Sequence, residues 1–128
     1  MLFRSETTPD LQTSRDLSDS YLKEIVEYIQ ENCTDNLTVG TITQRFAISR
    51  SNLMRLFQDN LGITPINYRI DCQLIEACTL LLKTDRRIED IAETLGFGNT
   101  YYFSSLFRKK MGFSPNHFRH AYAFTMYH

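Results

Sequence analysis

Two groups of mostly polar side chains recur at helical spacing in this sequence. One group is Ser51, Met54, Arg55 and Gln58, and the other is Tyr101, Ser104, Ser105 and Arg108. Residues three and four apart lie on the same face of a helix, so each group would form one exposed stripe. An α-helix in the major groove of DNA offers such a stripe to the edges of the base pairs. The chemistry that these residues predict is therefore recognition of double-stranded DNA.

Arg55 is the strongest candidate for reading a base. Its guanidinium can donate two parallel hydrogen bonds to guanine O6 and N7, and the alternative is a phosphate contact or a plain surface charge. Arg50 lies at the start of the same helix and can hold phosphate or base. Polar residues near helix N-termini can also hold phosphate. The predicted DNA contacts are Arg50, Ser51, Asn52, Met54, Arg55, Gln58, Asn99, Thr100, Tyr101, Ser104, Ser105, Arg108 and Lys109.

The basic run 108–110 divides between two faces of its helix. Arg108 continues the exposed stripe, and Lys109 is expected to contact phosphate. Lys110 falls on the inner side, where its stem would pack while its amine reaches outward.

The sequence gives little support for catalysis, metal binding or disulfide bonds. The sequence holds no Gly-x-Ser-x-Gly motif, phosphate-binding glycine loop or His-Glu-x-x-His motif, so we expect neither an enzyme nor a bound cofactor. His117 and His120 could share a metal ion, but no third ligand stands nearby, so we expect no metal site. The cysteines, Cys33, Cys72 and Cys78, form no Cys-x-x-Cys pair and are expected to be reduced core thiols.

The two polar groups belong to two copies of one sequence pattern. Residues 42–69 and 91–119 align at an offset of 49 residues before an internal turn and 50 after it. Each copy predicts a short helix, a tight turn and a longer helix, which is the outline of a helix-turn-helix. The stripes expected to face the core are Leu53, Leu56, Phe57 and Leu61 in the first copy, and Phe103, Leu106, Phe107 and Met111 in the second.

The longest helix should join the two copies. Thr64 and Pro65 predict its start, because proline is preset for the first helical position, and it should run to about Lys83. Its ~19 residues would span about 28 Å, close to the ~34 Å turn of B-DNA, so the helix has the length of a spacer. Thr38 and Ser49 can cap the two helices of the first copy.

The expected fold is all-α with about seven helices. Its parts are a mobile polar N-terminal arm (1–18), a first helix-turn-helix subdomain (19–63), a linker helix (64–84) and a second such subdomain (85–128). The first helix should run from Asp19 to about Asn32. The chain ends in an aromatic tail that is expected to pack back on the core, or to bind a partner if exposed. The tail residues are Tyr122, Phe124, Met126 and Tyr127.

Charge is distributed unevenly along the 128 residues, whose net charge is −1. Residues 1–37 carry a net charge of −5 and residues 38–128 carry +4, so the repeated part is mildly basic. The acidic leader either keeps the first helix soluble or faces away from DNA. No apolar run approaches the ~18 residues that span a bilayer, and the N-terminus lacks the pattern of a secretory signal. We expect a cytoplasmic protein with no membrane partner.

Both copies also resemble a known family. The second contains Ile91-Ala92-x-x-Leu95-Gly96-Phe97, Tyr102-Phe103 and Phe107-Arg108-Lys109-Lys110-x-Gly112-x-Ser114-Pro115-x-x-Phe118-Arg119. This resembles the C-terminal signature of AraC/XylS-type transcription regulators, and Ser49-Arg50-Ser51-x-Leu53-x-Arg55-Leu56-Phe57 resembles that family's first helix-turn-helix. The resemblance covers about residues 21–120. It implies two recognition helices in adjacent major-groove segments and a regulator that often contacts RNA polymerase.

The sequence departs from the family at informative places. The family commonly has a basic residue where Ser105 stands, so the second recognition helix should read bases weakly or only position the backbone. Ile42-Thr43 stands where Leu-Ala is usual, which is a conservative packing change. Only ~20 polar residues precede the first helix, too few for an effector domain. This resembles the small stand-alone members, unless the chain is a product that lacks that domain.

We therefore expect a sequence-specific transcription regulator, an activator, that binds an asymmetric DNA site as a monomer. The alternative is a helical protein-interaction module whose DNA surface is eroded and which binds a partner regulator. Ser105 and the low total charge favour the alternative, whereas Arg55 and the basic run favour DNA.

Overall fold

The computed structural model describes the backbone of residues 9–35 and 37–127, and the side chains of residues 20–35 and 37–122. Within these ranges the chain forms seven α-helices and no strand, which confirms the all-α prediction. The helices are α1 (Pro9–Asn32), α2 (Val39–Phe46), α3 (Arg50–Leu61), α4 (Pro65–Lys83), α5 (Ile88–Thr94), α6 (Thr100–Met111) and α7 (Pro115–Tyr127).

Short polar side chains fix where the helices begin. The Thr38 hydroxyl accepts a hydrogen bond from the Thr41 N–H at 3.1 Å, and the Ser49 hydroxyl accepts one from the Asn52 N–H at 3.1 Å. Each bond satisfies a backbone donor that has no partner inside the helix. Thr64 caps α4 in the same way, directly before Pro65. The starts predicted for α2, α3 and α4 are confirmed.

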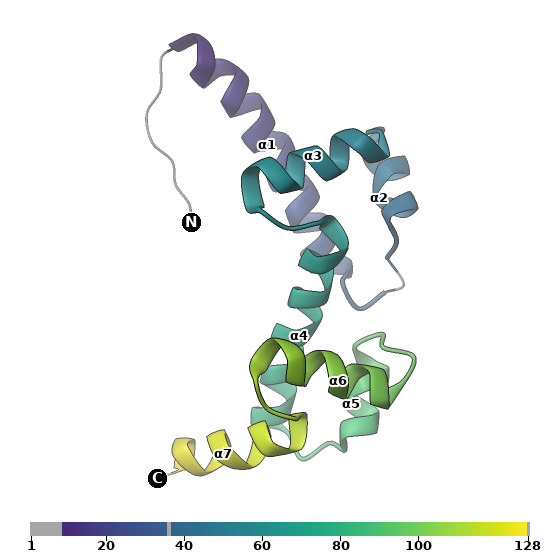
Figure 1. Cartoon of the computed structure of the whole chain (residues 1–128), viewed down its shortest axis with the longest axis vertical. Coiled ribbons are helices and arrows are strands. Elements are labelled where there is room, and N and C mark those ends of the chain that lie inside the picture. Colours follow the sequence, from purple (N-terminus) through teal and green to yellow (C-terminus); the bar gives the residue numbers. More distant parts are fainter. Residues whose placement is uncertain (1–8, 36, 128) are drawn as a thin grey trace.

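The helices gather around α4 in two groups, as Figure 1 shows. α1 and α3 contact α4 on the N-terminal side, with α2 packed on α3; α5 and α7 contact α4 on the C-terminal side, with α6 packed on both of them. The buried residues of the first core are Leu22, Ile25, Ile29, Leu37, Val39, Ile42, Leu53 and Phe57. Those of the second are Ile70, Leu74, Ala77, Leu81, Ile91, Ala92, Leu95, Phe97, Phe103 and Phe107. The linker helix thus supplies apolar side chains to the second core and carries both subdomains.

Three expectations about the bounds and lengths of the helices were wrong. α1 begins at Pro9 rather than Asp19, so residues 9–18 are helical in backbone and α1, at 24 residues, is longer than α4 at 19. The periodicity argument missed this start because residues 9–18 lack an apolar stripe. α7 continues to Tyr127, five residues beyond the expected end at about Tyr122. Residues 1–8 of the expected arm lie outside the described residues.

Leu61 does not face the core as expected. Its side chain is 40% exposed, because it is the last residue of α3 and the chain reverses at Gly62. Leu56, Leu106 and Met111 are half-buried against their cores, in keeping with the expected stripes.

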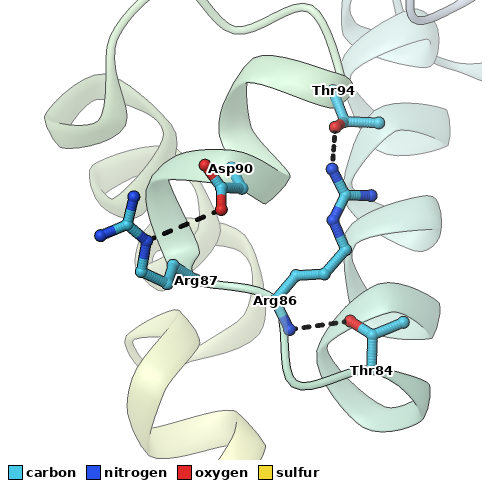
Figure 2. Close-up of polar contacts among 5 residues, drawn as sticks. All are labelled: Thr84, Arg86, Arg87, Asp90 and Thr94. Atoms are coloured by element: carbon cyan, nitrogen blue, oxygen red, sulfur yellow. Dashed lines mark hydrogen bonds and ion pairs between the residues drawn. The ribbon is translucent and has the colours of Figure 1, made fainter.

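Arginine side chains tie the second subdomain to the end of the linker helix. Arg119 of α7 donates from Nε to the Leu81 carbonyl at 3.0 Å and from Nη2 to the Thr84 carbonyl at 3.1 Å. In the loop between α4 and α5, the Arg86 N–H donates to the Thr84 hydroxyl and the Arg86 guanidinium donates to the Thr94 hydroxyl (Figure 2). The two bonds from Arg119 satisfy carbonyls at the end of α4 that have no partner within the helix.

Candidate DNA-binding surface

The first predicted recognition helix, α3, separates its residues by face as expected. Leu53 and Phe57 are fully buried in the first core. On the other side, the exposed residues are Arg50, Ser51, Asn52, Arg55 and Gln58. Met54 differs from the expectation, because it is half-buried and packs against the first core. The face available to a DNA groove is therefore polar with one strongly positive group near its middle.

Arg55 is oriented by a neighbour one helical turn earlier. Its Nη1 donates a hydrogen bond to Asn52 Oδ1 at 3.2 Å. A guanidinium carries five N–H donors in a fixed plane, so this bond restrains the group while other donors remain for a base or phosphate. Asn52 keeps its own amide N–H groups for a further contact. The two residues act as one polar unit on the exposed face.

An open cavity of about 500 Å³ lies beside this unit. It is bounded by Tyr21 from α1 and by the turn between α2 and α3 (residues 47–49), with Asn52, Arg55 and Asp59 of α3 in its wall. The Tyr21 hydroxyl donates to the Phe46 carbonyl at 2.6 Å, which fixes α1 against the end of α2. Neither Tyr21 nor Asp59 was predicted to contact DNA: Tyr21 belongs to the apolar stripe of its helix, and Asp59, although exposed four residues after Arg55, carries a negative charge.

The second predicted recognition helix, α6, repeats this division into a buried and an exposed face, but its exposed side chains differ from those of α3. Phe103 and Phe107 are fully buried, whereas Tyr101 is 82% exposed. Ser105, Arg108 and Lys109 are exposed as well, and Thr100 and Ser104 are half-buried. The exposed face therefore offers hydroxyls in its first turns and positive charge in its last turn.

Asn99 has a defined structural role at the start of α6. Its Oδ1 accepts a hydrogen bond from the Tyr102 N–H at 2.9 Å, so Asn99 is the N-cap of the helix. Its side-chain N–H groups remain for the DNA contact predicted for this residue. Tyr102 itself is half exposed and packs edge-on against Phe97 at 6.1 Å between ring centroids. Sequence reasoning did not include Tyr102 among the DNA contacts, although it stands beside Tyr101 at the N-terminal end of the helix.

Lys110 lies on the inner side of α6, as its position in the sequence indicates. Its Nζ forms an ion pair with Asp71 Oδ1 of α4 at 2.9 Å. Lys109 and Lys110 are both exposed, but they differ in surroundings, because the amine of Lys110 is paired with Asp71 of the linker helix.

The remaining polar and thiol groups point to no other site. His117 packs against Phe113, with ring centroids 5.2 Å apart, and no group of three or more metal-ligating side chains gathers within the described side chains. Burial raises the pKa of the Cys33 and Cys78 thiols and raises that of Cys72 to about 11. The cysteines are free, with Cys33 buried and the other two half-buried. None of the described helices is long and apolar enough to cross a membrane.

The side chains of the aromatic tail are described only as far as Tyr122. That residue stacks on Phe118 at 4.7 Å between centroids and meets Phe113 edge-on at 6.2 Å, while 42% of its surface is exposed. The side chains of Phe124, Met126 and Tyr127 lie outside the described residues.

Comparison with known proteins agrees with this geometry. Residues 42–121 match the model of a helix-turn-helix domain family. The chain is 33% identical over 102 residues to the arabinose operon regulatory protein of Escherichia coli K12, covering 79% of this chain and 35% of that protein. It is 30% identical over 119 residues to the transcriptional activator RhaS of an Enterobacter strain, covering 93% of this chain and 41% of RhaS. The chain thus spans less than half the length of these curated relatives.

Solved structures are similar over the same region. The C-terminal domain of AraT, a response regulator from Geobacillus stearothermophilus, superposes with a TM-score of 0.75 at 32% identity, covering 79% of this chain and 84% of that one. The DNA-binding domain of AdpA, solved with a target DNA, superposes with a TM-score of 0.74 at 29% identity, covering 79% of this chain and 91% of AdpA's. With its two helix-turn-helix units on one linker helix, the chain belongs to the AraC family of helix-turn-helix DNA-binding proteins.

Proposed function

We propose that this protein is a sequence-specific regulator of transcription that binds one asymmetric DNA site as a monomer. The observation that carries the proposal is the pairing of two recognition helices, each buried on one face and polar on the other, on a single linker helix. Each helix can enter the major groove, and the two together read adjacent segments of it. Because α3 and α6 differ in sequence, the two half-sites differ too.

The relatives support regulation by activation. RhaS is named a transcriptional activator, and another relative regulates the arabinose operon. By analogy this chain activates transcription, and a contact with RNA polymerase would deliver the effect. Binding to DNA is in keeping with a location in the cytoplasm of a bacterial cell. The proposal assigns it no catalytic activity.

Selection of bound duplexes from a random library tests the proposal directly. We expect enrichment of one motif of roughly 20 bp without a palindrome, because one chain presents two unequal helices to the site. The purified motif should then shift as a complex of one chain per duplex. A palindromic motif bound by two chains would contradict the monomer.

The rival function is a protein-interaction module, favoured by Ser105 on the exposed face of α6 and by the net charge of −1. In that case no motif would be enriched from the library, and affinity for any duplex would stay in the micromolar range or weaker that is typical of non-specific binding.

A further inference from the structure

Within the described residues, the two subdomains also approach each other directly, at a place beside the linker helix. The loop after α1 meets the turn between α5 and α6, where a Cβ atom on Gly96 would lie 2.5 Å from the Thr34 carbonyl oxygen. Side-chain carbons do not approach a backbone oxygen so closely, and the φ of +89° at Gly96 also disfavours any residue with a Cβ. Glycine at position 96 therefore permits a contact between segments that are 62 residues apart in the sequence.

A buried amide on the linker helix completes this contact. The Gln73 side chain is only 1% exposed, and its Nε2 donates a hydrogen bond to the Leu95 carbonyl at 2.8 Å. The same Nε2 would lie 3.5 Å from a Cβ at position 96. Thr34 follows the buried Cys33, and Leu95 is buried as well. We call Thr34, Gln73, Leu95 and Gly96 the subdomain junction.

The Gln73 amide contributes more to the relative position of the subdomains than to the free energy of folding. Gln73 Oε1 accepts no hydrogen bond from the described residues although it is buried. An unpaired buried acceptor is costly, and an apolar side chain of the same shape would avoid the cost. What the amide supplies is a directed bond that holds the turn before α6 at one place relative to α4.

We propose that the subdomain junction sets the distance and rotation between the two recognition helices, and so selects the spacing of the two half-sites on DNA. The inference rests on the proposed function. A linker helix alone gives one line of attachment, about which each subdomain can twist. The junction lies off that line, and a second point of attachment removes the twist. Adding one base pair between the half-sites moves one of them by about 3.4 Å and rotates it by about 35°. A protein with a rigid junction therefore cannot contact both half-sites of the altered duplex at once.

The decisive variant is Gly96→Ala, and Gly112→Ala is its matched control. Both glycines have a φ of +89°, so alanine brings the same backbone strain to each. Nothing lies within 4 Å of a Cβ on Gly112, whereas at Gly96 the Thr34 carbonyl must move away. The pair therefore separates strain in the turn from opening of the junction.

The readout is binding to three duplexes made from the selected motif: the native spacing, one base pair more and one base pair fewer. The parent and Gly112→Ala should lose about tenfold or more on each altered spacing, because linked binding units lose avidity when their geometry forbids joint contact. Gly96→Ala should bind the native duplex more weakly, and its three affinities should differ by less than about threefold by the same argument. A loss of stability alone would lower all affinities without changing their ratios.

A second variant and a second measurement keep the test decisive if Gly96→Ala fails to fold. Gln73→Met removes the bond to the Leu95 carbonyl without adding a clash, and it should flatten the spacing preference to a smaller degree. Alkylation of Cys33, followed by peptide mapping, reports opening of the junction, since this buried thiol directly precedes Thr34. It should be faster in either junction variant than in Gly112→Ala.

The outcomes separate the inference from the proposed function. If the parent rejects altered spacings and both junction variants reject them equally well, the inference is wrong while the proposed function stands. If the parent binds no duplex specifically, the proposed function fails and the inference falls with it. A flattened preference in the junction variants, with Gly112→Ala unchanged, establishes the junction as the determinant of spacing.

Discussion

At the scale of single residues, the two recognition helices are chemically unequal. α3 presents Arg55, held by Asn52 on an exposed face, whereas α6 presents the exposed hydroxyl of Ser105 among tyrosines and basic residues. A bidentate arginine discriminates between bases much better than a serine, which forms a single weak hydrogen bond in either direction. The first helix should therefore carry most of the sequence discrimination.

Substitution of Arg55 tests this inequality. Arg55→Ala should lose ~1–3 kcal/mol on the cognate site and relax the preference at one base pair. Ser105→Ala should change the binding free energy by under about 1 kcal/mol, the range of one neutral hydrogen bond. Binding isotherms at one salt concentration, on the cognate duplex and its single-base variants, give both values. If Arg55→Ala ranks the variants as the parent does, the assigned reading surface is wrong.

Lys109 and Lys110 allow a comparison between a lysine without an ion pair among the described residues and one that is paired with Asp71. Lys109→Ala should weaken binding to all sequences alike and reduce the slope of log affinity against log salt by about 1, because one phosphate contact is lost. Lys110→Ala should leave that slope nearly unchanged, since its Nζ is paired with Asp71. Salt titrations of both variants on specific and random duplexes make the comparison. Equal changes in slope for the two variants would contradict the phosphate role of Lys109.

At the scale of the helices, most starts could be predicted because their signals are local. Thr38, Ser49 and Thr64 are capping residues, and each stands directly before the helix it caps. Residues 9–18, at the start of α1, carry no apolar stripe. The spacing of apolar residues therefore did not predict that α1 begins at Pro9. The position of Met54 also escaped prediction, because a polar stripe in the sequence does not say how wide the buried face is.

The C-terminal end of the linker helix provides a stability prediction. Arg119→Ala should lower the free energy of unfolding by about 1.5–3 kcal/mol, since it removes charge-assisted hydrogen bonds to the Leu81 and Thr84 carbonyls. Arg87→Ala is the control, because the Arg87–Asp90 ion pair seen in Figure 2 is largely exposed and should contribute under about 1 kcal/mol. Urea unfolding followed by circular dichroism measures both. Equal losses for the two variants would show that Arg119 does not hold α7 to α4.

At the scale of the whole molecule, the proposed function depends on how two small subdomains are joined. The sequence repeat predicted both units and the helix between them, because the same apolar spacing occurs twice. It could not predict the subdomain junction, since Thr34 and Gly96 belong to different units and no periodic pattern connects them. Contacts between distant turns depend on the final packing and leave no signal in local spacing.

The charge distribution gives a prediction for the intact protein. With a handful of phosphate contacts from residues such as Arg50, Arg108 and Lys109, log affinity should fall with log salt at a slope of about −3 to −6. The acidic residues before position 38 should not contribute to this slope. Equilibrium binding over a range of salt concentrations measures it. A slope near zero would exclude the phosphate contacts.

Groove-specific chemical footprinting of the selected duplex tests the central claim most directly, because it shows where each recognition helix lies. The account predicts protection of two major-groove segments about one helical turn apart, within roughly 20 bp, with one chain bound. Protection of a single segment, or of two symmetric segments with two chains bound, would contradict the claim that one chain reads DNA with both of its recognition helices.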